Sequence, residues 1–293
     1  IIKCLAINMY FKFKTFLYYL LNDRYWLTKK ISLFFYKIFQ ERKLMNIFVK
    51  NELSKLLKLE TIKKDKDQKI FDPVLNLTNK YKPEIIDLAR IYDLINKNKP
   101  FTVLEFGVGY STIVIAKALY DNKKKFDEKN FNEIRNTKMF KVFSVDASEK
   151  WIEETKKNLP DYLKEFVEFK QSSVETKLIN NQLCHIYKDI PDINPEFIYL
   201  DGPHPLDPIG KINNVSFQCL ERTPISADIL YLESTFLPGT TILVDGRVNN
   251  VRFLKNNLKR NYDYYWDRNG DITIIKLNEK KLGKINKLGF EFY

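Results

Sequence analysis

Residues 103–111 read Val-Leu-Glu-Phe-Gly-Val-Gly-Tyr-Ser, and this stretch decides how the chain folds. A short apolar run passes through Glu105 into a Gly-x-Gly-x-Ser turn. This pattern predicts a buried strand that turns sharply into a helix. Glycine has no Cβ, so we expect Gly107 and Gly109 where a ligand approaches the backbone closely.

The same turn argues against a fold that binds a nicotinamide or flavin dinucleotide. Those folds carry a third glycine three residues after the second, and here that position is Thr112. The carboxylate of Glu105 would also repel a pyrophosphate. It suits a ligand that carries a cationic amino group and neutral sugar hydroxyls.

Further apolar runs predict the rest of a parallel sheet. Strands are expected at 102–106, 142–145, 166–171, 197–200 and 241–244, and a terminal hairpin at 262–266 and 272–277. Helices are expected at 83–96, 112–120, 149–159 and 248–261, with an exposed polar insertion at 121–138. Residues 205–227 are long enough to form a substrate loop.

Four of these strands end in or pass through an acidic residue, namely Glu105, Asp146, Asp201 and Asp245. Ligands of open α/β sheets collect at the carboxyl ends of the strands, so the four acids should share one edge. Asp146 lies further past Gly109 than usual for a ribose-binding acid, and the polar insertion accounts for that distance. We therefore expect Asp146 to bind a ribose.

The glycine turn with Glu105, the acid at 146 and the terminal hairpin resemble the S-adenosylmethionine-dependent methyltransferases with a Rossmann-like fold, over roughly residues 70–278. The resemblance implies an α/β fold with a doubly wound, mostly parallel seven-stranded sheet, closed by a C-terminal antiparallel hairpin. It also implies how the cofactor is held. The turn from Glu105 to Ser111, with Gly107 and Gly109, would wrap its methionine part, and Ser173 and Val174 would neighbour the adenine.

The catalytic residues are expected just past strands 197–200 and 241–244. His204 is a candidate general base, since a neutral imidazole accepts a proton near neutral pH. Asp201 and Asp245 also resemble the paired metal ligands of catechol-type O-methyltransferases, which leaves Mg²⁺ or Mn²⁺ open. Those enzymes place asparagine directly after the second aspartate, whereas this chain has Gly246. Arg247 and Arg252 are candidates to clamp a phosphate or carboxylate of the substrate.

The charge and cysteine content of the chain restrict where it is expected in the cell and what it is expected to bind. The net charge is +12, but the excess is almost all lysine scattered along the chain, which argues against a nucleic-acid-binding face. The three cysteines lack disulfide or zinc spacing, which favours a reducing cytoplasm.

Residues 1–70 are expected to form an amphipathic helical extension before a methyltransferase domain at 71–293. Lysines interrupt its apolar runs, so it is too polar to cross a membrane. Contact of residues 1–60 with the inner face of the membrane, or with a partner chain, stays open beside the simpler expectation that they cover their own domain.

The sequence thus predicts a cytoplasmic methyltransferase that methylates a hydroxyl of a sugar or another small metabolite. A weaker resemblance, to uncharacterised methyltransferase-like proteins of surface-polysaccharide clusters, points to polysaccharide biosynthesis. Two alternatives are a nucleic-acid methyltransferase and a catalytically idle scaffold that keeps the fold for binding.

Overall fold

The computed structural model describes residues 38–57, 85–126, 136–219, 221–267 and 271–281. The chain divides into two compact units, Ile1–Ile47 and Phe48–Tyr293. A helix runs over residues 38–50. The extension predicted at 1–70 and its membrane contact fall largely outside the described residues. Its domain boundary therefore stays a prediction.

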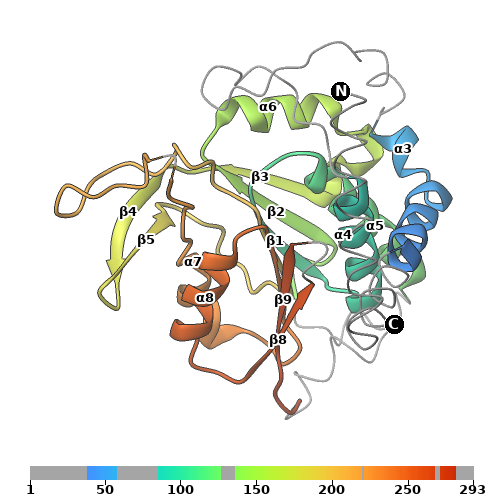
Figure 1. Cartoon of the computed structure of the whole chain (residues 1–293). Coiled ribbons are helices and arrows are strands. Elements are labelled where there is room, and N and C mark those ends of the chain that lie inside the picture. The colour runs from blue at the N-terminus through green and yellow to red at the C-terminus, as the bar shows by residue number, and fades with distance from the viewer. Residues whose placement is uncertain (1–37, 58–84, 127–135, 220, 268–270, 282–293) are drawn as a thin grey trace, which may run out of the picture. The chain divides into compact units, whose positions relative to one another are not determined.

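A seven-stranded sheet forms the centre of the second unit (Figure 1). Its strand order is β3-β2-β1-β6-β7-β9-β8; β3, β2, β1, β6 and β7 are parallel, and β9 is antiparallel to both of its neighbours. The strands are β1 (Thr102–Phe106), β2 (Lys141–Asp146), β3 (Val167–Gln171), β6 (Phe197–Leu200), β7 (Thr241–Asp245), β8 (Tyr262–Asp267) and β9 (Ile272–Leu277). The predicted mostly parallel sheet with a terminal hairpin is therefore confirmed.

The central strands are buried on both faces because helices cover both sides of the sheet. Successive side chains of a strand alternate between its two faces. Leu104 and Phe106 of β1 share a core with Ile229 and Phe253, which lie on α7 and α8. Glu105 faces the other way, toward α5. The helices are α3 (Leu53–Leu56), α4 (Ile85–Asn98), α5 (Tyr110–Lys125), α6 (Glu149–Asn158), α7 (Asp228–Leu232) and α8 (Val248–Asn257), with 3₁₀ turns at η3 (Asp161–Phe166) and η4 (Glu233–Thr235).

A second, two-stranded sheet was not anticipated from the sequence. Strands β4 (Val174–Ile179) and β5 (Gln182–Tyr187) form an antiparallel hairpin beside the main sheet (Figure 1). Asn180 and Asn181 both have positive φ, at 49° and 60°, as a tight two-residue hairpin turn requires. An Asn-Asn pair between two alternating segments is the signal that would have revealed it.

The predicted polar insertion begins later than expected. Helix α5 continues to Lys125, and the amide of Asn122 is fully buried and donates to the carbonyl oxygen of Ile95. Phe126 then packs edge-on against Phe101. Residues 121–126 are therefore part of the packed domain. The sequence did not reveal this because the buried residue Asn122 is polar and depends on a hydrogen-bond partner in α4.

The long segment predicted as a substrate loop, 205–227, runs mainly along the β4–β5 hairpin. Ile209 exchanges backbone hydrogen bonds with β4, through Thr176 and Val174, and His185 of β5 binds residues 225 and 227 in the same way. Only the beginning of the segment stays near the carboxyl ends of the parallel strands. Backbone pairing with a hairpin that the sequence had not revealed thus determines its path.

The turns that follow β1 and β6 touch backbone to backbone. The amides of Asp201 and Gly202 both donate to the carbonyl oxygen of Phe106, at 3.0 and 2.5 Å. Gly107 has a φ of +100°. A Cβ on Gly202 would lie 2.5 Å from the nitrogen of Gly107 and 2.7 Å from its Cα. Neither turn therefore has room for a side chain at this contact.

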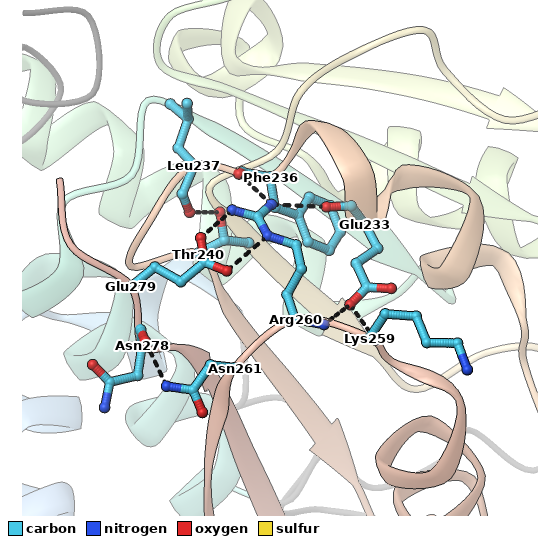
Figure 2. Close-up of polar contacts among 9 residues, drawn as sticks. All are labelled: Glu233, Phe236, Leu237, Thr240, Lys259, Arg260, Asn261, Asn278 and Glu279. Carbon is cyan, nitrogen blue, oxygen red and sulfur yellow. Dashed lines mark hydrogen bonds and ion pairs between the residues drawn. The ribbon is translucent and has the colours of Figure 1, made fainter. Parts of the chain in front are cut away.

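At the opposite edge of the sheet, where β7 begins, one arginine holds several segments together (Figure 2). Arg260 donates to the carbonyl oxygens of Glu233 and Phe236, at 3.0 and 2.7 Å, and forms a two-point ion pair with Glu279. The carboxylate of Glu233 in turn accepts the backbone amides of Lys259 and Arg260. This cluster joins the segments just before β8 and just after β9 to the segment that precedes β7.

Of the helices in the described part of the chain, none has the length and apolarity that crossing a membrane requires.

We predict that Gly202→Ala destabilises the domain by about 3 kcal/mol, because its Cβ would overlap backbone atoms that cannot move aside. Gly109→Ala is the matched control. A Cβ there meets nothing within 4 Å, and the φ of 175° is extended backbone that alanine adopts freely. Urea unfolding measures both variants. Equal stability of the two would show that the contact between the turns does not constrain the fold.

Candidate functional site

A cavity of about 700 Å³ opens at the carboxyl ends of the parallel strands. Its walls come from the turn after β1, one face of α6, part of α4, and the segments after β6 and β7. The structure brings most of the predicted site residues to this cavity. They are Gly107, Gly109, Ser111, Asp146, Asp201, His204, Asp245 and Arg247.

Asp146 lines the cavity at the end of β2. One carboxylate oxygen accepts the amide of Val108 at 2.8 Å, and the other accepts the amide of Ser148 at 2.7 Å. Asp146 thereby ties the glycine turn to the start of α6. A carboxylate can accept about four hydrogen bonds, so acceptor sites remain for hydroxyl groups of a ligand. Burial raises the pKa of Asp146, and these backbone amides oppose the rise.

The two glycines of the turn serve different purposes. Gly107 needs its positive φ and its contact with Gly202, so it shapes the fold as well as the site. Gly109 borders open space and is the N-cap of α5. The expectation that both glycines make room for a ligand therefore holds for Gly109, whereas Gly107 makes room for the neighbouring turn.

Glu105 does not line the cavity but lies fully buried beneath the turn. Its Oε2 accepts the hydroxyls of Thr112 on α5 and Ser144 on β2, each at 2.6 Å. Burial raises the pKa of Glu105 to about 7, and the hydroxyls of Ser111, Ser144 and Thr112 oppose the rise. In this structure Glu105 holds the start of α5 to the sheet and does not present its carboxylate to the cavity.

Ser173 and Val174, the predicted neighbours of an adenine, lie outside the residues that line the cavity. Val174 begins β4 and is buried in the hydrophobic core, and the carbonyl oxygen of Ser173 accepts the amide of Lys188. Hairpin formation directs both residues away from the cavity.

A carboxylate pair lies where β6 and β7 end. The hydroxyl of Tyr199 donates to Oδ2 of Asp245 at 2.9 Å, and Asp201 opens into the cavity beside them. Protein encloses Asp201 on most sides, and the resulting loss of hydration, together with the charge of Asp245, raises the pKa of Asp201 to about 7. The guanidinium of Arg247 opposes this rise.

Arg247 differs from its predicted role as a clamp for substrate anions. Its Nη2 donates to the carbonyl oxygens of Asp201 and Pro203, the latter at 3.0 Å, and its Nη1 is buried. The guanidinium therefore fastens the turn after β6 to the end of β7. Arg252, the next arginine along, is exposed and donates to Asn249 on its own helix.

His204 lines the cavity from a tight turn. Its backbone amide donates to Asp207, and its Nδ1 accepts the amide of Leu206 at 3.3 Å. A neutral imidazole carries one ring proton, so an acceptor Nδ1 places that proton on Nε2. In this arrangement Nε2 is a donor toward a ligand. His204 acts as a base only if the contact with Leu206 breaks.

Several cavity residues were not assigned to the site from the sequence. Tyr199 faces the cavity from within β6, and Ser148, Trp151 and Glu154 line it from α6. The spacing of the last two, three residues apart on one helix, is the pattern of a shared face and is the signal that would have found them.

No group of three or more His, Cys, Asp or Glu side chains placed to hold a metal ion occurs in the described ranges. Asp201 and Asp245 are two oxygen ligands without a third, and Gly246 supplies no side chain where an amide would be needed. The geometry does not support the predicted Mg²⁺ or Mn²⁺ site.

Comparison with known proteins adds distant likenesses only. No protein-family model and no curated protein matches the chain. The chain is similar to an O-methyltransferase from Bacillus cereus in complex with SAH, with 15% identity over 78% of this chain and 90% of that one and a TM-score of 0.40. It is also similar to a putative caffeoyl-CoA O-methyltransferase from Staphylococcus aureus, with 14% identity over 82% of this chain and 99% of that one and a TM-score of 0.42. A third similar structure is the O-methyltransferase TomG from Streptomyces achromogenes in complex with SAM, with 12% identity over 78% of this chain and 89% of that one and a TM-score of 0.39.

All three TM-scores lie below 0.5, so the strand order, rather than these likenesses, identifies the fold. Five parallel strands followed by an antiparallel β9 inserted between β7 and β8 form the sheet expected from the resemblance of the sequence. The chain therefore has the doubly wound α/β fold with a C-terminal antiparallel hairpin that the sequence predicts.

We predict that Arg247→Met destabilises the domain by about 2–3 kcal/mol, because two carbonyl oxygens lose a charged donor. Arg252→Met, which removes an exposed arginine of α8, is the control and should change stability by less than about 0.5 kcal/mol. Chemical denaturation of both variants tests this assignment. A stable Arg247→Met variant would return Arg247 to the role of a ligand clamp.

Proposed function

We propose that the protein is an S-adenosylmethionine-dependent methyltransferase that methylates a hydroxyl of a sugar or another small hydroxylated molecule. One observation carries the proposal. One cavity of about 700 Å³ is lined by three features: Asp146 at the end of β2, Gly109 with open space beside it at the start of α5, and the carboxylates of Asp201 and Asp245 next to Tyr199. This volume lies in the range of cofactor and small-molecule sites.

The cofactor would lie across the glycine turn. Gly109 leaves its approach open, Ser111 and the first turn of α5 offer polar groups, and Asp146 has acceptor sites left for ribose hydroxyls. When bound, S-adenosylmethionine supplies a methyl group on a sulfonium, which is already a good leaving group. Ser173 and Val174 lie outside this arrangement, and residues of α6, such as Trp151, line the cavity instead.

The protein's part in the chemistry is to align the acceptor hydroxyl and to accept its proton. Asp201 is better placed than His204 for the second task. Its carboxylate opens into the cavity, whereas Nδ1 of His204 already accepts the amide of Leu206. The hydrogen-bonded pair Tyr199 and Asp245 lines the cavity beside Asp201. Arg247 acts on the reaction by fixing the backbone of Asp201.

The alternatives fit the cavity less well. A nucleic-acid substrate brings phosphates, and the described residues of the lining carry more carboxylates than cations. An idle scaffold would bind the cofactor without turnover, and the activity assay below separates it from an enzyme. A cytoplasmic location and a place in polysaccharide biosynthesis remain predictions.

Asp146→Asn should weaken binding of S-adenosylmethionine by about 1.5–3 kcal/mol, roughly tenfold to a hundredfold, because the variant loses a charged acceptor for ribose hydroxyls. Asp161→Asn removes a carboxylate that is 95% exposed and does not line the cavity, and serves as the control. Isothermal titration gives both affinities, and thermal unfolding separates a loosened glycine turn from a lost ligand contact. Unchanged affinity in Asp146→Asn would contradict the placement of the cofactor.

If Asp201 accepts the proton, Asp201→Asn should lower kcat by about 10²–10⁴-fold while cofactor affinity changes little. His204→Ala should cost less than about tenfold, since Nδ1 is engaged with the backbone. Turnover of a hydroxylated acceptor, with and without a chelator, is the measurement. The reverse ranking of the two variants would restore His204 as the base, and loss of turnover on chelation with recovery by Mg²⁺ would establish a metal mechanism.

A further inference from the structure

The cavity differs in charge from the rest of the protein. The chain carries a net charge of +12. Among its described residues, those that line the cavity include six carboxylates and only two cations, Lys150 and Arg247. The six are Asp87, Asp146, Glu154, Asp201, Asp207 and Asp245. The excess of lysine therefore lies elsewhere, and a ligand in the cavity meets a negative field.

Half of these six carboxylates come from the side proposed for the acceptor. Asp201 and Asp207 follow β6 and Asp245 ends β7, and Arg247 is the cation of the same segments. Asp201 lies close enough to Asp245 that the charge of Asp245 contributes, after burial, to the raised pKa of Asp201. Asp207 acts in the same direction on Asp146. Carboxylates that repel one another in this way are stabilised by a cation placed among them.

The guanidinium of Arg247 is directed mainly to the backbone. Its Nη2 donates to the carbonyl oxygens of Asp201 and Pro203, and its Nη1 is buried without a hydrogen-bond partner among the described residues. With all three carboxylates ionised, its single charge offsets one and leaves two in excess. The sulfonium of the proposed cofactor would offset one of these two. One negative charge is then left for the acceptor to meet. Because the pKa of Asp201 is raised to about 7, a bound ammonium would also favour the ionised form of Asp201.

Building on the proposed function, we propose that the acceptor is a hydroxylated molecule that also carries an ammonium group, as an amino sugar does. Asp201 and Asp245 would contact the ammonium and the neighbouring hydroxyl. Acceptors with a phosphate or carboxylate at this end are disfavoured, because they would meet carboxylates and a guanidinium whose Nη2 is engaged with the backbone and whose Nη1 is buried. The cavity thus selects its substrate by charge before it positions a hydroxyl.

Three probes that share one ring and differ in charge test this inference. Glucosamine carries an ammonium at pH 6.5, glucose is neutral, and glucuronate carries a carboxylate. Binding of each is measured by titration calorimetry or ligand-observed NMR to the full chain saturated with SAH, which lacks the sulfonium charge. We expect glucosamine to bind about tenfold more tightly than glucuronate, or better, and more tightly than glucose.

Asp245→Asn should reduce the ratio of the glucosamine and glucuronate affinities at least about threefold, while its amide oxygen can still accept the hydroxyl of Tyr199. Asp207→Asn is the second variant, and it should act in the same direction if Asp245→Asn does not fold. Glu153→Gln is the matched control. It removes a carboxylate from the exposed side of α6, where Glu153 pairs with Lys156, and should leave the ratio unchanged.

The outcomes separate this inference from the proposed function. Failure to bind SAH refutes the proposed function, and this inference with it. Binding of SAH without a preference for glucosamine, or with a preference that the two variants leave intact, refutes only the charge selection. A preference that disappears or reverses in favour of glucuronate when Mg²⁺ is added would show that a metal ion supplies the missing cation, and would overturn the ammonium assignment.

Discussion

The backbone contact between Gly107 and Gly202 is the constraint on which the rest of the site depends. The turns after β1 and β6 meet with no side chain between them, and both amides at Asp201 and Gly202 donate to Phe106. Because the two strands are neighbours in the sheet, this contact sets how closely the glycine turn and the Asp201 segment approach. The two sides of the cavity that we propose for the cofactor and the acceptor are thereby held at a fixed separation, as transfer of a group between two ligands would require.

Buried polar groups extend this constraint outward. Glu105 joins the start of α5 to β2 from below the turn, and Asp146 joins the turn to α6 from the side. Arg247 does the same for the far wall through two carbonyl oxygens. A charged or polar group removed from water is costly unless it is hydrogen-bonded, so each of these residues holds its partners in one arrangement. Three residues that resemble ligand-binding groups in the sequence thus act partly or wholly as supports for the walls of the cavity.

The charge of the whole chain and the charge of the cavity lining have opposite signs. Scattered lysines give the molecule its positive charge, and many lie in exposed ion pairs, such as that between Lys156 and Glu153, which contribute little to stability. The cavity has the opposite sign because parallel strands deliver their terminal acids to one edge. The net charge of the chain therefore does not describe the cavity, whose lining carries more carboxylates than cations.

The sequence by itself determined the sheet and the place of the site. Apolar runs of strand length, a glycine turn and acids at strand ends are local signals, and they located β1, β2, β6, β7 and the terminal hairpin within a residue or so. It also placed Asp146, Asp201 and Asp245 at one edge, because parallel strands share their direction.

Only the tertiary structure decided which of these residues face the cavity. Glu105 and Asp201 both follow apolar strand residues, yet one is buried under α5 and the other opens to the ligand, since strand alternation and turn geometry direct them differently. Ser173 and Val174 were drawn away by a hairpin whose strands pair with each other. The role of Arg247 likewise rests on carbonyl oxygens more than forty residues away in the chain. Contacts between such distant segments leave no local pattern, because either partner alone has the composition of an ordinary loop.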